Sequence, residues 1–204
     1  LVRERDLARI PLVGHSLGGG VELYVALGLR DAGEHHRLQR LVLVAGAAYR
    51  QPLPPFVAMA RHARLSGLAL RALGPELVIA QALRAMVFDP GGITGDQIRG
   101  YAAPLRDPRS FGALCASALQ IVPLDLDRIT SRYREIDVPA LLLWGRQDGA
   151  VPLWVGRRLA DALPRGTLRV IERCGHMLPE ERPGESLEAL RAFLDAYPAH
   201  LPPD

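Results

Sequence analysis

The sequence predicts an α/β fold in which a mostly parallel sheet is flanked by helices, and two observations support this. Short apolar runs of the buried-strand type recur along the chain, at residues 10–13, 41–44, 140–144 and 167–171. Stretches with helical periodicity lie between these runs. Because alternating strands and helices favour parallel pairing with helical connections, we expect one parallel sheet at the centre of the protein.

The first apolar run leads into the pentapeptide 14–18 (GHSLG), which has Ser16 at its centre, and a helix-compatible stretch follows from 19 to 29. A strand, a tight turn and a helix with serine at the apex form a nucleophile elbow. We expect Gly14 and Gly18 to be needed because side chains there would collide at the strained turn. The helix then begins at the nucleophile, so the Leu17 N–H faces a developing oxyanion. The alternative is a glycine-rich turn in which Ser16 only caps the helix.

A serine hydroxyl is a weak nucleophile unless a histidine and an orienting acid assist it. The run at 140–144 leads into a loop that contains Asp148, and the run at 167–171 leads into a loop that contains His176. Because the carboxyl ends of parallel strands meet at one edge of the sheet, we predict that Ser16, Asp148 and His176 form a catalytic triad there. The competing interpretations are a turn aspartate in an Asp-Gly pair and a structural histidine.

Other histidines and carboxylates are weaker candidates for these roles. Neighbouring residues at a strand end point to opposite faces, so we expect His15 to pack behind the elbow rather than to act as the base. We predict that the remaining histidines are surface residues: His35, His36, His62 and His200. The rival acids are Glu22 on the elbow helix and Asp125 and Asp127 before a predicted helix. No carboxylate occurs at 45–50, directly after the strand at 41–44.

These motifs resemble those of α/β-hydrolase-fold enzymes. The segment 142–148 (LLWGRQD) with Val151 and Pro152 is similar to the acid loop of that family, and 174–176 (CGH) with Pro179 and Glu180 is similar to its histidine loop. Both loops are most like those of small-molecule esterases and of carbon–carbon hydrolases that cleave ring-fission products. The resemblance covers residues 10–197, although 51–137 match only in general character. Carbon–carbon hydrolases often have an aromatic residue where this chain has Met177.

The resemblance implies a hydrolase core made of residues 1–50 and 138–204, with residues 51–137 inserted as a helical cap. Within the insertion, helical periodicity predicts helices at 56–73 and 75–88, and Thr94 and Gln97 have the spacing of a capping box at a further helix start. After the acid loop we expect closing helices at 153–163 and 183–197 and a tail at 198–204. The family normally places several strands and a His-Gly loop, which supplies a second oxyanion donor, before the elbow. We therefore expect an N-terminally truncated piece in which the Leu17 N–H is the only oxyanion donor that can be assigned.

The implied function is a serine hydrolase that cleaves a small apolar ester, lactone or related acyl compound through an acyl-enzyme. The resemblance implies neither a metal nor an organic cofactor. Two alternatives stay open: a carbon–carbon bond hydrolase of ring-fission-type diketones, and a catalytically silent fragment or binding homologue. The identity of the substrate and the oligomeric state do not follow from the sequence.

Composition fits one globular domain with a substantial core and a lid, since 49% of residues are hydrophobic and 23% are charged. The net charge is only +3, and arginines are scattered among acidic residues, which argues against a nucleic-acid partner. Cys115 and Cys174 have no metal-ligand or disulfide pattern, so we predict that both are buried. The apolar runs are too short for a membrane span and no signal peptide is visible, so the expected location is the cytoplasm and the expected partner is a small molecule.

Overall fold

The computed structural model describes residues 2–54, 57 and 59–197. Within them, four strands form one sheet in the order β1-β2-β3-β4, and every neighbouring pair is parallel. The strands are β1 (Ile10–His15), β2 (Leu38–Val44), β3 (Ala140–Gly145) and β4 (Gly166–Ile171). The predicted parallel α/β sheet is confirmed, and each apolar run expected to be a strand is one.

The two inner strands carry the centre of the core. Leu41, Leu43 and Leu142 are completely buried, as expected for near-continuous apolar sequence in a parallel sheet covered on both faces. β1 lies at one edge of the sheet that the described residues form, and Val13 on this strand is 59% exposed. The strand that leads to Ser16 therefore has one open side in this part of the chain.

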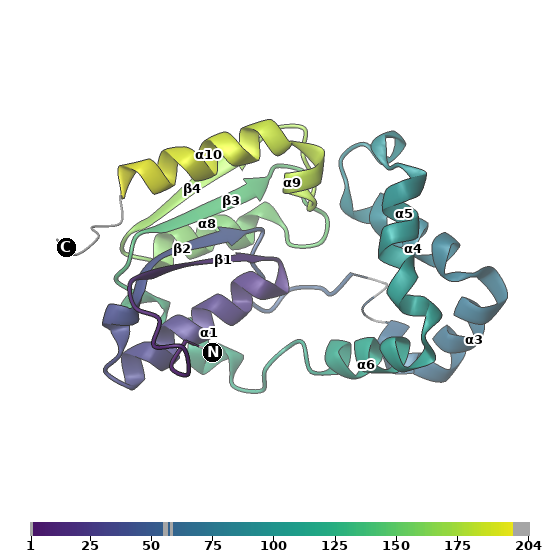
Figure 1. Cartoon of the computed structure of the whole chain (residues 1–204), viewed down its shortest axis with the longest axis horizontal. Coiled ribbons are helices and arrows are strands. Elements are labelled where there is room, and N and C mark those ends of the chain that lie inside the picture. Colours follow the sequence, from purple (N-terminus) through teal and green to yellow (C-terminus); the bar gives the residue numbers. More distant parts are fainter. Residues whose placement is uncertain (1, 55–56, 58, 198–204) are drawn as a thin grey trace.

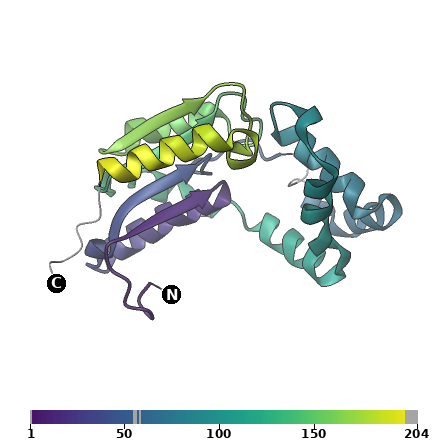
Figure 2. The same ribbon diagram turned by 45° about the horizontal axis from the view of Figure 1, so that its top comes forward.

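Helices cover both faces of the sheet. One face carries α10, and the other carries α1 and α8 (Figures 1 and 2). Their bounds are α1 (Leu17–Asp31), α8 (Leu153–Ala162) and α10 (Pro183–Ala196). This layering places the elbow helix α1 directly behind the edge strand β1, with the carboxyl ends of all four strands at one end of the sheet.

The loop after β3 is held in place by a buried tryptophan. Trp144 is fully buried, and its indole N–H donates to the Val151 carbonyl at 2.9 Å, which satisfies the only polar atom of the ring. A Cβ added at Gly156 would lie 2.7 Å from this ring, so glycine lets α8 approach β3 closely. These contacts fix the segment in which Asp148 lies.

Between β2 and β3 the chain forms the helical insertion, by which we mean the segment from α3 to α6, and then helix α7. Helices α3 to α6 stand beside the carboxyl ends of the strands (Figure 1), and Ile129 of α7 belongs to the core. The bounds are α3 (Ala63–Leu73), α4 (Pro75–Met86), α5 (Gly95–Ala102), α6 (Pro108–Leu119) and α7 (Leu126–Thr130). The predicted capping box is confirmed, since the Gln97 N–H donates to Thr94 Oγ1 and the Thr94 N–H donates to Gln97 Oε1.

Some helix ends differ from the sequence-based expectation. The first insertion helix was expected from Phe56, which lies outside the described residues, and α3 begins at Ala63 after a 3-10 turn. Helix α4 ends two residues before the expected end at Phe88, because the Phe88 N–H donates to the Glu181 carboxylate instead of continuing the helix. A short helix α9 (Leu178–Glu181) was not expected. The short 3-10 turns are His35–Arg37, Met59–His62, Pro90–Gly92, Ala103–Arg106 and Tyr133–Glu135.

Both cysteines are buried free thiols, as predicted. Burial raises the pKa of Cys174 to about 12, so this thiol stays protonated at neutral pH. Among the described helices, none combines the length and the apolar character that a bilayer crossing needs. The tail predicted at 198–204 lies outside the described residues.

Candidate active site

Ser16 stands between β1 and α1 in a strained backbone conformation. Its φ of 56° and ψ of −118° lie in a region that non-glycine residues rarely occupy, at a cost of about 1–3 kcal/mol. The Ser16 N–H donates to the Val44 carbonyl at 2.9 Å, and the Ser16 carbonyl accepts from the N–H groups of Gly19 (3.1 Å) and Ala47 (2.9 Å). Strand β2 and the loop that follows it therefore hold the turn.

The glycines of this turn do not all act as expected. A Cβ at Gly14 would lie 2.5 Å from the Gly18 backbone, so the requirement at Gly14 is confirmed. The same prediction for Gly18 is wrong, because nothing lies within 4 Å of a Cβ built there. The close contacts are made by the next two residues instead. A Cβ added at Gly19 would lie 2.7 Å from Gly46, and a Cβ added at Gly20 would lie 2.6 Å from the Ala47 carbonyl. Helix α1 thus packs against the loop after β2 through its second and third glycines.

The structure brings Ser16, His176 and Asp148 together in one hydrogen-bonded chain. His176 Nε2 lies 2.9 Å from Ser16 Oγ, and His176 Nδ1 lies 2.8 Å from Asp148 Oδ2. A carboxylate only accepts hydrogen bonds, so this contact places the histidine proton on Nδ1 and leaves Nε2 free to accept from the Ser16 hydroxyl. The arrangement is suited to removing a proton from Ser16.

Asp148 is oriented by its own loop. Its Oδ1 accepts from the N–H groups of Ala150 and Val151, at 2.8 Å each, while Oδ2 faces the histidine. The side chains of Asp148 and His176 are 0% and 4% exposed. Excluding water from both groups strengthens their electrostatic interaction, since the local dielectric constant is lower than in solvent.

Leu17 is the first residue of α1. The N–H group of the first residue of a helix has no acceptor within the helix, and the helix dipole makes this end positive. The Leu17 N–H therefore lies next to Ser16 at the positive end of the helix dipole, and it stays the predicted oxyanion donor.

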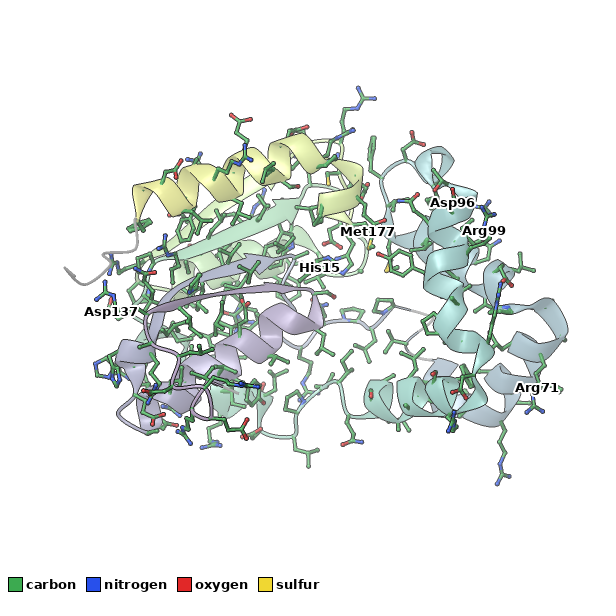
Figure 3. The ribbon with its side chains drawn as sticks, viewed as in Figure 1. His15, Arg71, Asp96, Arg99, Asp137 and Met177 are labelled. Carbon is green, nitrogen blue, oxygen red and sulfur yellow. The ribbon has the colours of Figure 1, made fainter. Side chains whose placement is uncertain are left out.

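His15 binds the histidine loop. Its Nε2 donates to the His176 carbonyl at 2.8 Å, and the two rings are tilted with their centroids 4.7 Å apart. Burial lowers the pKa of His15, so its ring is neutral at pH 7. With Nε2 protonated toward a carbonyl, that nitrogen cannot take a proton from Ser16. Figure 3 shows His15 and Met177 on the side of the core that faces the helical insertion.

None of the rival acids that the sequence offered is bonded to His176. Asp125 pairs with Arg128 at the start of α7, with 2.7 Å between the charged groups, and Asp127 is exposed. Glu22 is only 6% exposed, and neither of its carboxylate oxygens has a hydrogen-bond partner among the described residues. Burial raises the pKa of Glu22 to about 8, so this carboxyl group holds its proton at neutral pH. It therefore lacks the negative charge that would stabilise an imidazolium.

The histidine loop is in backbone contact with two other segments, which sequence reasoning missed. A Cβ at Gly145 would lie 2.0 Å from the Gly175 carbonyl, and a Cβ at Gly175 would lie 2.4 Å from the Met86 carbonyl. The Met86 carbonyl also accepts from the His176 N–H at 2.8 Å. The glycines were visible in the sequence, but nothing local indicates that the end of α4 crosses this loop.

A cavity of about 210 Å³ lies between the helical insertion and α9. Its walls are both apolar and charged, and include Leu83, Phe88, Ile93, Arg173, Met177 and Glu181. Ser16 is not among its lining residues. Within the described part of the chain, no group of three or more His, Cys, Asp or Glu side chains could hold a metal ion.

Comparison with known proteins was consistent with this architecture. Residues 4–190 match the model of the alpha/beta hydrolase family. The chain is 29% identical over 183 residues to the "uncharacterized hydrolase YugF" of Bacillus subtilis, covering 90% of this chain and 64% of that protein. It is 32% identical over 174 residues to a 2-hydroxy-6-oxo-6-phenylhexa-2,4-dienoate hydrolase of Burkholderia cepacia, covering 81% and 55%.

Among solved structures, an alpha/beta hydrolase fold protein from Burkholderia ambifaria superimposes with a TM-score of 0.77 at 25% identity. That match covers 93% of this chain and 67% of the other protein. The chain thus spans about three fifths of the length of its relatives. Because the family model covers nearly the whole sequence and the fold agrees, the chain belongs to the alpha/beta hydrolase family.

Proposed function

We propose that this chain is the catalytic part of a serine hydrolase that cleaves a small apolar ester, lactone or related acyl compound. One observation carries the proposal: a continuous hydrogen-bonded chain runs from Ser16 Oγ through the His176 ring to Asp148. The strained backbone of Ser16 adds support, because such strain persists where surrounding structure enforces it and is concentrated at functional sites.

The reaction begins when Ser16 Oγ attacks the carbonyl carbon and His176 Nε2 accepts the hydroxyl proton. Asp148 accepts the Nδ1–H bond and offsets the positive charge that forms on the imidazole ring. Negative charge develops on the substrate oxygen, where the Leu17 N–H stabilises it. As the tetrahedral intermediate collapses, His176 gives its proton to the leaving alkoxide, and the acyl group stays on Ser16.

The second half of the reaction restores the enzyme. Water attacks the acyl carbonyl, and His176 Nε2 takes one of its protons. Collapse of the second intermediate breaks the bond between the acyl carbon and Ser16 Oγ, to which His176 returns the proton. The products are a carboxylic acid and an alcohol.

A second candidate is hydrolysis of a carbon–carbon bond in a ring-fission-type diketone. The names of several relatives favour it, including the 2-hydroxy-6-oxo-6-phenylhexa-2,4-dienoate hydrolase of Burkholderia cepacia and 2-hydroxy-6-oxononadienedioate/2-hydroxy-6-oxononatrienedioate hydrolases. In this chemistry the leaving group is a carbanion, so a proton must be delivered to carbon rather than to oxygen. Met177 departs from the aromatic residue that often follows the histidine in such enzymes.

A comparison of substrates in three proteins tests these alternatives. The wild type is assayed with a short-chain aryl ester and with a vinylogous diketone, beside Ser16→Ala and the matched control Ser131→Ala, which removes an exposed hydroxyl bonded to the Arg128 carbonyl. We expect ester turnover that is lost in Ser16→Ala and retained in the control. Faster diketone cleavage would favour the second candidate. No turnover of either substrate would favour a silent binding homologue.

A further inference from the structure

Glu181, at the end of α9, binds the backbone on both sides of His176. The Gly175 N–H lies 3.0 Å from each of its carboxylate oxygens, and the Met177 N–H donates to Oε1 at 3.0 Å. Hydrogen bonds from backbone N–H groups to a carboxylate are charge-assisted and stronger than neutral ones. One side chain therefore binds the N–H groups of the residues directly before and after the histidine.

The same carboxylate also binds the helical insertion. Its Oε2 accepts from the Phe88 N–H at 2.7 Å, two residues after α4 ends. The His176 N–H in turn donates to the Met86 carbonyl at 2.8 Å. At Gly175 the two backbones approach so closely that a Cβ would lie 2.7 Å from the Phe88 nitrogen. The histidine loop, α9 and the end of α4 thus form one bonded unit.

The preceding residue, Glu180, faces another part of the insertion. Its Oε2 accepts from Gln97 Nε2 at 2.8 Å, and its Oε1 accepts from the Tyr101 hydroxyl, both on α5. The two neighbouring carboxylates of α9 therefore have different hydrogen-bond partners. Among the described residues, the hydrogen bonds of the Glu180 carboxylate go to the insertion, whereas those of Glu181 go to both the insertion and the histidine loop, so the pair permits a matched comparison.

We propose that Glu181 is a positioning residue for His176 and that it couples the position of the helical insertion to the orientation of the imidazole. The inference rests on the proposed function. With the N–H groups of Gly175 and Met177 bound by Glu181 and the His176 N–H bound by the Met86 carbonyl, the backbone on both sides of His176 is restrained, and with it the direction in which the side chain leaves the backbone. That direction must be accurate, because a misplacement of about 1 Å costs on the order of 10²-fold in rate. Without the insertion in this position, the loop would lack the Met86 carbonyl and Glu181 would lack the Phe88 N–H.

The kinetic test compares Glu181→Gln with two controls of equal charge change. Glu185→Gln removes a carboxylate that is 58% exposed and pairs with Arg182 at 3.8 Å. Glu180→Gln alters the contacts with Gln97 and Tyr101 of α5. We expect Glu181→Gln to lower kcat by roughly 10- to 100-fold with KM unchanged, Glu180→Gln to change KM more than kcat, and Glu185→Gln to change neither. An equal loss of kcat in Glu181→Gln and Glu185→Gln would overturn the proposal.

A spectroscopic test does not depend on turnover. The Nδ1 proton shared by His176 and Asp148 gives a low-field proton NMR resonance, identified by its loss in His176→Ala. We expect this resonance to shift or broaden in Glu181→Gln and to stay unchanged in Glu185→Gln. If Glu181→Gln fails to fold, Glu181→Asp takes its place in the same test. This variant keeps the negative charge but has a side chain one methylene group shorter, so its carboxylate no longer reaches the same N–H groups.

The two tests separate failure of the positioning role from failure of the proposed function. If the wild type hydrolyses no substrate, the proposed function fails, and the resonance alone decides whether Glu181 orients His176. An unchanged resonance in a folded Glu181→Gln variant overturns the positioning role whatever the activity.

Discussion

The carboxylate of Asp148 turns one oxygen toward its own loop and the other toward His176. Oδ1 accepts two backbone N–H groups, and Oδ2 lies 2.8 Å from His176 Nδ1. Because the loop fixes the first oxygen, the second has one direction available. The histidine ring is thereby held in the tautomer that leaves Nε2 open toward Ser16.

Asp148→Asn should lower turnover by about 10⁴-fold while the fold is preserved. An amide nitrogen facing Nδ1 would donate rather than accept, which favours the tautomer that carries its proton on Nε2. Turnover of an aryl ester and far-UV circular dichroism measure the two effects. Asp127→Asn, at an exposed position on α7, is the matched control. Near wild-type turnover in Asp148→Asn would contradict the role of Asp148 as the acid that orients His176.

Glu22 should make the protein less stable as the pH rises. Burial raises its pKa from 4.5 to about 8 in the folded state, so between these values the folded protein keeps a proton that the unfolded chain has lost. The free energy of unfolding therefore falls as the pH increases through this interval. We predict that Glu22→Gln raises the Tm more at pH 9 than at pH 5, with the exposed Glu188→Gln as control. The same change in Tm at both pH values would contradict a raised pKa of Glu22 in the folded protein.

The open edge of β1 should promote self-association of the 204-residue chain. Unpaired strand edges with apolar side chains are templates for pairing, and a lysine on the edge suppresses it. We predict that Val13→Lys reduces concentration-dependent light scattering. Leu65→Lys, which replaces a side chain that is 68% exposed on α3, controls for the added charge. If both substitutions reduce scattering equally, the edge is not the cause.

The strands and the order of the site residues could be predicted from the sequence because their signals are local. The apolar run, the GHSLG turn around Ser16 and the helical stretch after it lie within about twenty residues, and each constrains the others. The capping box at Thr94 is a four-residue pattern and is confirmed for the same reason. Local patterns of this kind depend little on distant parts of the chain.

What could not be predicted depends on contacts between distant segments. Gly18 was expected to be sterically required, but the close approaches lie at Gly19 and Gly20, because the loop after β2 packs there. The end of α4 at Met86 and the role of Glu181 share one cause, since both depend on the crossing of the insertion over the histidine loop. No periodicity or spacing within either segment carries that information.

The role of Ser16 as the nucleophile is tested most directly by mapping the site at which a fluorophosphonate probe reacts with the folded protein. We expect one covalent adduct, mapped by mass spectrometry to the peptide that contains Ser16. It should be absent in Ser16→Ala, slower to form in Asp148→Asn and unchanged in Ser131→Ala. An adduct that persists in Ser16→Ala, or that maps to another serine, would contradict the assignment of Ser16 as the nucleophile.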